Sequence, residues 1–285
     1  MKKTFGIIGY GKLGQALAGQ LHAKKRLAWI CSESADETKE IPDIDFYRTI
    51  QEIKTPTDII FIAKADSFIE SAATDLAEHF KEKLNKKTVI HCSGVLSVGI
   101  LESCLATGAV TAKAHPFQTF YNAGEKVFEN VPWAVESPGN FSEIEAIIKF
   151  LNGTAFDITK IKEFNPRLYH ISAVIASNYM NTIISAAFDA AKKSGVKPEE
   201  FLPVILRTTL ENNIASFEKD AEILPLTGPI ARGDIKTIKL HLETLSEHKD
   251  LLEQYSRIGL ATAEIAYRQD LITGDIYRTI KKLFT

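Results

Sequence analysis

The chain has 285 residues, 45% of them hydrophobic and 25% charged, and its 34 basic and 36 acidic side chains leave a net charge of −2. These values are ordinary for globular proteins, the length is comfortable for two domains, and the balanced charge provides no basic surface for nucleic acid. No apolar stretch is expected to approach the roughly 18 residues of a membrane span, so we expect no membrane partner.

The start of the chain has the pattern of a strand, a glycine-rich turn and a helix. Residues 4–8 are an apolar run, residues 9–14 read GYGKLG, and residues 15–24 have the apolar spacing of an amphipathic helix. In a G-x-G-x-x-G turn the glycines permit the tight turn, the approach of a pyrophosphate and close helix packing, in that order. The alternative is a turn that serves packing alone. The predicted cofactor contacts are Gly9, Tyr10, Gly11, Lys12, Leu13 and Gly14.

Strands and helices alternate up to about residue 158, and helical patterns alone follow. Further strands are expected at 27–32, near 45–47, and at 57–63, 87–92, 110–115, 131–136 and 155–158, with a helix at 67–83. Later helices are expected at 167–194, 198–219, 234–247, 251–269 and 275–283. We therefore predict an α/β fold with a Rossmann-type parallel sheet in a dinucleotide-binding domain over residues 1–158, and an all-α domain over residues 159–285.

Three cysteines, Cys31, Cys92 and Cys104, have no C-x-x-C spacing. An odd number without that spacing argues against a disulfide framework or structural zinc and favours a reducing compartment. We expect three buried small side chains in a cytoplasmic protein. The sequence also has no metal-ligand cluster, no G-x-S-x-G elbow and no P-loop lysine, so no metal site is predicted and hydrolase and kinase functions have no support.

Cofactor preference depends on the residue that closes the second strand. An acidic residue there bonds the ribose 2′-hydroxyl of NAD, whereas a small polar or basic residue leaves room for the 2′-phosphate of NADP. Ser32 as the contact favours NADP and Glu33 favours NAD, and both alternatives stay open, with a preference for NADP. Ala63 and Ser93, near the ends of later strands, are expected to complete the cofactor site.

Two histidines are expected at the carboxyl ends of parallel strands, where ligands bind in such sheets. His91 is predicted to contact substrate, and His115 to donate a hydrogen bond or shuttle a proton near neutral pH. Either histidine could instead be a loop residue that bonds the backbone.

The long helix over 167–194 carries polar residues within an apolar pattern. His170, Ser177, Asn178 and Asn181 lie at i, i+7, i+8 and i+11, which is one helix face. Buried polar groups need partners, so this face either lines a wet cleft or bonds a neighbouring helix. In a cleft, His170 and Asn178 would be catalytic, and Ser177 and Asn181 would bind substrate.

A loop over residues 226–234 contains two glycines and a proline before a helix. Asp234 is expected to cap that helix. Arg232 either binds a substrate carboxylate or forms a salt bridge.

Four further stretches, VIHCSG, AHPFQTF, YHISAVIASN and LTGPIARGD, carry a resemblance. With GIIGYGKLG they make the whole chain similar to Rossmann-like NADP oxidoreductases with an uncharacterised helical C-terminal domain, in the superfamily of 6-phosphogluconate dehydrogenase, ketopantoate reductase and pyrroline-5-carboxylate reductase. The resemblance implies a homodimer through the helical domain and substrate in the cleft between domains. Better-known members use Lys, with Asn one turn later, where this sequence has His170 and Val174. His170 is predicted to replace that Lys.

These features together predict an NAD(P)-dependent reductase or dehydrogenase of a small carbonyl, imine or hydroxy compound. His115 and His170 would donate protons, Asn178 would orient the substrate, and Arg232 would anchor a carboxylate. The alternative is a dinucleotide-binding regulator or sensor without hydride transfer, which the missing Lys would favour.

Overall fold

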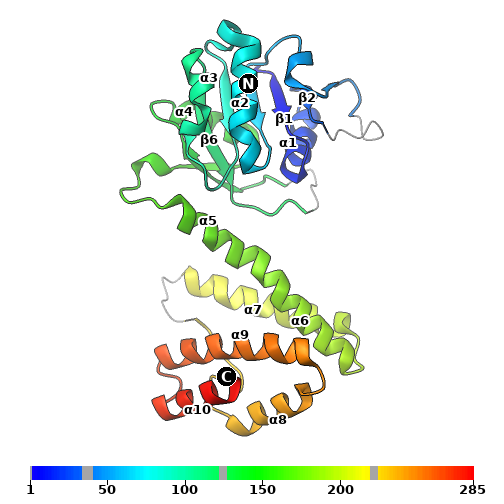
Figure 1. Ribbon diagram of the computed structural model, residues 1–285, viewed down its shortest axis with the longest axis vertical. Coiled ribbons are helices and arrows are strands. Elements are labelled where there is room, and N and C mark those ends of the chain that lie inside the picture. Colours follow the sequence, from blue (N-terminus) through cyan, green and yellow to red (C-terminus); the bar gives the residue numbers. More distant parts are fainter. Residues whose placement is uncertain (1, 34–40, 122–126, 219–223) are drawn as a thin grey trace. The chain divides into compact units, whose positions relative to one another are not determined.

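The computed structural model describes residues 2–33, 41–121, 127–218 and 224–285 (Figure 1). Lys219, at which the predicted helix over 198–219 ends, lies outside the described residues. The chain forms two compact units, Met1–Ser177 and Asn178–Thr285. The boundary after residue 158 was placed where strand patterns stop in the sequence, and it stays a prediction.

The first unit is built on one eight-stranded sheet in the order β3-β2-β1-β4-β5-β6-β7-β8. Every neighbouring pair is parallel except β6 and β7, which are antiparallel. The predicted α/β fold with a Rossmann-type sheet and a helical C-terminal region is confirmed. The strands are β1 (Phe5–Ile8), β2 (Leu27–Cys31), β3 (Asp45–Tyr47), β4 (Ile59–Ile62), β5 (Thr88–His91), β6 (Val110–Pro116), β7 (Pro132–Glu136) and β8 (Thr154–Asp157).

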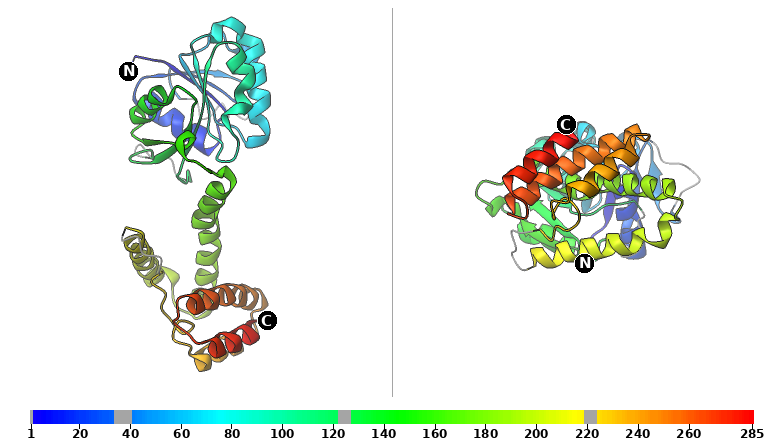
Figure 2. Two further views of the ribbon diagram at one scale, coloured as in Figure 1. Left: turned by 90° about the vertical axis from the view of Figure 1, so that its left-hand side faces the viewer. Right: turned by 90° about the horizontal axis from the view of Figure 1, so that it is seen from below.

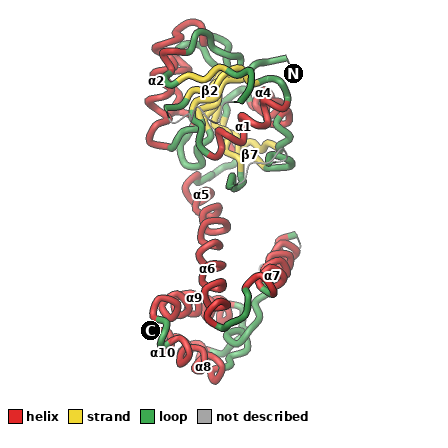
Figure 3. The backbone as a smooth tube through the Cα atoms, turned by 90° about the vertical axis from the view of Figure 1, so that its right-hand side faces the viewer, coloured by secondary structure: helices red, strands yellow, loops and turns green. Residues whose placement is uncertain are grey.

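Helices cover both faces of this sheet, as Figures 2 and 3 show. One apolar cluster joins the sheet to α1 (Lys12–Ala23) and α4 (Phe141–Phe150). A second cluster on the other face joins it to α2 (Ile69–Phe80) and α3 (Glu102–Ala106). Every residue of β1 and β4 is buried because both faces are covered, which explains their uninterrupted apolar sequences. The three cysteines are buried, as predicted.

The remaining chain is helical, with ends set by local capping. Asn165 accepts hydrogen bonds from the first turn of the helix that Pro166 opens, and Gly195, at φ +84°, follows its end. Asp234 caps α8, as predicted. The helices are α5 (Pro166–Val174), a π-helical turn (Ile175–Tyr179), α6 (Met180–Lys193), α7 (Leu202–Phe217), α8 (Ile235–Leu245), α9 (Lys249–Arg268) and α10 (Gly274–Phe284).

The expectation that no segment approaches membrane-spanning length is wrong for one helix. Pro166–Lys193 is continuous, and it is long and apolar enough to cross a membrane by length and composition alone. Its Ser, Asn and Thr residues interrupt each apolar run, so a search for uninterrupted apolar residues missed it. None of its most apolar window is buried in the structure.

Candidate functional site

The glycine turn has the strained backbone and close contacts that its sequence predicts. Gly9 has φ +99°, and a Cβ atom there would lie 2.5 Å from the carbonyl oxygen of Ala63. A Cβ atom on Gly14 would overlap the carbonyl oxygen of Gly9. Because both obstacles are backbone atoms, the turn and the packing of α1 on the sheet require these two glycines.

Gly11 differs from them, because a Cβ atom there would meet no atom of the described residues within 4 Å. Gly11 precedes α1, which has no side-chain cap and no acidic residue in its first turn. The N-terminus of α1 is therefore open to an anion, which its N–H groups and dipole would attract. Beside it, Tyr10 packs edge-on against Phe46 at 5.8 Å. Open space over the second glycine fits a pyrophosphate group.

The end of β2 opens into a polar cavity of about 200 Å³ that Ser32, Glu33, Arg48 and Lys64 help to line. Lys64 Nζ lies 3.6 Å from Glu33 Oε1. The sequence analysis placed Ser32 and Glu33 here but missed both basic residues, because they follow β3 and β4 rather than β2. This cavity fits the adenosine end of a dinucleotide.

His91 and Ser93 are buried and organise the loop after β5. The backbone N–H of Ser93 donates to His91 Nδ1 at 3.3 Å, so Nε2 carries the proton and donates to the Ser97 carbonyl at 3.1 Å. Ser93 Oγ accepts from the N–H groups of Val95 and Leu96. Burial, followed by the charge of Lys113, lowers the pKa of His91 to about 4. Both side chains therefore bond the backbone of their own loop.

His115 and His170 lie together, although 55 positions separate them in the chain. Their ring centroids are 6.0 Å apart, and Tyr169 O–H lies 3.5 Å from His115 Nδ1. His115 is the residue before last in β6, whereas Tyr169 and His170 lie in α5. Burial, followed by the neighbouring His170 and Lys113, lowers the pKa of His115 to about 4. The imidazole of His115 is therefore neutral at pH 7.

Both imidazole rings pack against Gly94. A Cβ atom on Gly94 would lie 2.5 Å from His170 Nδ1 and 3.0 Å from His115 Nε2. His170 Nδ1 is buried and has no hydrogen-bond partner among the described residues. A buried ring nitrogen without a partner is unfavourable, so its place beside a second imidazole nitrogen indicates a functional role.

Aromatic side chains complete this part of the first unit. The ring of Tyr169 lies 5.1 Å from Phe117, 5.6 Å from Phe164 and 6.5 Å from Phe156. Burial raises the pKa of Tyr169 to about 12, so its hydroxyl stays protonated. The sequence analysis assigned no role to Gly94, Phe117 or Tyr169, although the first two follow the strand ends at which ligands were expected.

The other predicted residues of the helical region lie at or beyond the end of the first compact unit. Ser177 Oγ donates to the Ala173 carbonyl at 2.6 Å. The π-helical turn, Ile175–Tyr179, interrupts the 3.6-residue period on which the single polar face was argued. Asn178, Asn181 and Arg232 are exposed and belong to the second compact unit. No group of His, Cys, Asp or Glu able to hold a metal occurs among the described residues.

Comparison with known domains agrees with this architecture. Residues 1–116 match the Rossmann-like domain, and residues 131–262 match a domain of unknown function, DUF2520. The chain thus combines a Rossmann-like domain with a DUF2520 domain, which confirms the predicted resemblance. No curated protein matches the sequence.

Several solved structures share the fold. A candidate NADP oxidoreductase of Bacteroides fragilis is 21% identical, with a TM-score of 0.72 over 92% of this chain and 98% of its own. A Thermotoga maritima protein is 22% identical, with a TM-score of 0.68 over 92% of this chain and 99% of its own. Pyrroline carboxylate reductase of Plasmodium falciparum, solved with NADP bound, is 18% identical, with a TM-score of 0.60 over the full length of both chains. At these low identities, the structural likeness shows a shared fold.

Proposed function

We propose that the protein is an NAD(P)-dependent reductase or dehydrogenase of a small carbonyl, imine or hydroxy compound. The convergence of His115 and His170 on Gly94 carries this proposal, because it places two imidazole nitrogens in the same unit as the glycine turn. The open helix N-terminus beyond Gly11 and the polar cavity at β2 fit a dinucleotide. Structural neighbours that are named as NADP oxidoreductases and imine reductases support the same class.

The bound cofactor would supply hydride to the substrate carbon. His115, neutral at pH 7, would donate a hydrogen bond from its ring to the oxygen or nitrogen on which negative charge develops. His170 would supply the proton that this atom takes up, which balances the addition of hydride. Phe117 and Tyr169 would exclude water from one side of the reacting group.

The test is oxidation of NADPH in the presence of small carbonyl and imine compounds, followed by absorbance. The proposal expects at least one compound to be reduced. Tight NADPH binding with no oxidation by any compound would instead favour the regulator or sensor alternative. Oxidation that Gly94→Val leaves unchanged would also contradict the proposal, because that side chain would displace both histidines.

For the cofactor, we propose a preference for NADP. Arg48 and Lys64 bring two positive charges to the cavity where Ser32 closes β2, and a 2′-phosphate carries the complementary charge. Glu33, which lies beside Lys64, and Asp75, which also lines the cavity, oppose this preference. Titration of the protein with NADPH and NADH measures the balance directly, and tighter binding of NADH would overturn the preference.

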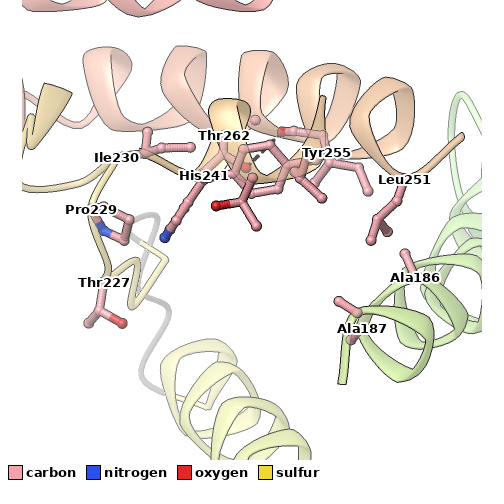
Figure 4. Close-up of a pocket in the computed structure, with 14 residues that line it drawn as sticks. Ala186, Ala187, Thr227, Pro229, Ile230, His241, Leu251, Tyr255 and Thr262 are labelled. Atoms are coloured by element: carbon pink, nitrogen blue, oxygen red, sulfur yellow. Dashed lines mark hydrogen bonds between the residues drawn. The ribbon is translucent and has the colours of Figure 1, made fainter. Parts of the chain in front are cut away.

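We also propose that the protein is a homodimer formed through its helical unit. An apolar groove of about 560 Å³ lies among α6, α8, α9 and the loop before α8. Figure 4 shows His241 and Tyr255 near its centre and Ala186 and Ala187 at its α6 side. In the same unit, α7 exposes a series of apolar side chains and packs mainly on the short turn that precedes it. The exposed apolar residues of α7 are Val204, Ile205, Leu210, Ile214 and Phe217.

The groove and α7 supply the two halves of a reciprocal contact, in which α7 of each copy lies in the groove of the other. Light scattering after size exclusion measures the mass in solution. We expect a dimer, and a monomer for Ile205→Asp and for Leu251→Asp, which place a charge on either half. A monomeric wild-type protein, or one that needs detergent to stay soluble, would overturn this proposal.

A further inference from the structure

One lysine is buried in the sheet next to the two histidines. Lys113 lies on β6 with none of its surface exposed, and no other Lys, Arg, Asp or Glu is buried to this extent in the described part of the chain. Removing an ammonium group from water is unfavourable, and a methionine would fill similar space without that penalty. A charge at this position therefore indicates a specific role.

The ammonium group connects two strands and a loop. Lys113 Nζ donates to the carbonyl of Gly94 at 3.2 Å. In the sheet, Lys113 pairs with His91 on β5 and with Glu136 on β7. Glu136 also accepts a hydrogen bond from the Val98 N–H at 3.1 Å, which ties it to the segment after the same loop. Lys113 thus bonds the Gly94 turn to the strand that carries His115. The negative charge of the nearby Glu136 carboxylate favours the charged form of Lys113.

The same turn carries both imidazoles. Side chains two residues apart on a strand lie on one face of the sheet, so Lys113 and His115 share a face. The carbonyl of Gly94 is held by Lys113, while its α-carbon faces His170 Nδ1 and His115 Nε2. A shift of the Gly94 carbonyl would therefore move the surface against which the two ring nitrogens pack.

We propose that Lys113 is a positioning residue, which fixes the Gly94 turn so that the nitrogens of His115 and His170 converge. The inference rests on the proposed function, since that convergence is what the reduction uses. The titratable groups that act on His115 are His170 and Tyr169 from α5, Lys113 from β6, His91 from β5 and, at longer range, Asp66.

The test compares Lys113→Met with a control of the same kind, Thr111→Val. Thr111 is a buried polar residue on the same strand and face, two positions further from the site. NMR titration follows the histidine ring signals. We expect the titration of His115 to change in Lys113→Met, because the Gly94 turn against which the ring packs loses its hydrogen bond and a nearby positive charge is removed. Thr111→Val should leave it unchanged. An unchanged His115 titration in folded Lys113→Met would overturn the proposal.

A second measurement applies if Lys113→Met does not fold. Lysine-selective NMR of otherwise unmodified protein should show the Lys113 Nζ signal shifting in both His115→Ala and His170→Ala, because the three groups share the Gly94 turn. A signal that moves in neither variant would contradict the proposal. If the histidine titration shifts as expected but no compound is reduced, Lys113 keeps its role and the proposed reduction fails. Once a substrate is known, Lys113→Met should lower kcat by about tenfold or more while KM for NADPH stays constant.

Discussion

The two compact units differ in how completely they bury their apolar side chains. In the first unit, clusters on opposite faces of the sheet are closed by four helices. In the second, the buried cluster is small and draws on α8, α9, α10 and the preceding loop, while Val204, Ile214 and Phe217 of α7 stay more than half exposed. Both faces of the sheet are thus covered by helices, whereas the apolar side chains of α7 are exposed.

This difference separates chemistry from assembly. His115, His170, Gly94 and the glycine turn all lie in the unit whose core is complete. The groove and the exposed side chains of α7 lie in the unit whose core is incomplete. Substitutions in the first unit should therefore change catalysis or folding stability, and those on α7 should change association.

The largest effect is expected at His170. His170→Ala removes the proposed proton donor, so turnover should fall by about 10² to 10⁴ while cofactor affinity stays constant. Ser172→Ala is the matched control, because Ser172 is exposed on the same helix and bonds only the Tyr169 carbonyl in the described structure. Steady-state kinetics with NADPH measure both. Equal turnover of the two variants would remove His170 from the mechanism.

The next effect compares one change in the two units. Ile147 on α4 is fully buried, so Ile147→Ala should lower the free energy of unfolding by about 2–5 kcal/mol. Ile214 on α7 is 53% exposed, so Ile214→Ala should have little effect on unfolding of the monomer, within about 0.5 kcal/mol, but should weaken the dimer. Urea unfolding at low and high protein concentration separates the two contributions. Similar losses of monomer stability in Ile147→Ala and Ile214→Ala would contradict the difference in burial between the two units.

Acid should destabilise the first unit through its buried histidines. The pKa of His91 is about 4 in the folded protein and ordinarily 6.5, so between these values the unfolded chain binds a proton that the folded one does not. Stability present above pH 6.5 should thus decline towards pH 4, by on the order of 3 kcal/mol for His91. Urea midpoints measured across this range should vary less in His91→Gln. Identical pH profiles would show that His91 is not the cause.

The smallest effect concerns cofactor choice. Arg48→Ala removes one positive charge at the β2 cavity, which should reduce the preference for NADPH over NADH by about tenfold, or about 1.4 kcal/mol. Gln51→Ala changes a neutral residue of the same cavity and should leave the ratio unchanged. Fluorescence titrations of both nucleotides give the ratio. An unaltered ratio in Arg48→Ala would mean that the 2′-phosphate does not contact Arg48.

The sheet was predictable because its strands are uninterrupted apolar runs between helices, and the glycine turn was predictable because its spacing is local. The site was predictable only in part. His115 and His170 were identified separately, yet their approach across Gly94 depends on where α5 begins relative to β6. Arg48 was missed because the sequence analysis considered only the residues that close β2. Arg48 follows β3, which lies beside β2 in the sheet. No spacing of residues in the sequence predicts the π-helical turn. The single polar face was argued from a 3.6-residue period, which the helix does not keep at this turn.

The most direct test of the account is titration of the purified protein with NADPH, using Gly11→Ala and Gly19→Ala as a matched pair. In the part of the chain that the structure describes, a Cβ atom at either glycine meets nothing within 4 Å, so both variants should fold. Gly11 faces the proposed pyrophosphate position, whereas Gly19 lies further along α1. We predict that wild type and Gly19→Ala bind NADPH, and that Gly11→Ala binds at least about tenfold more weakly. Absence of NADPH and NADH binding by the wild type, or equal binding by the two variants, would contradict a dinucleotide site at this turn.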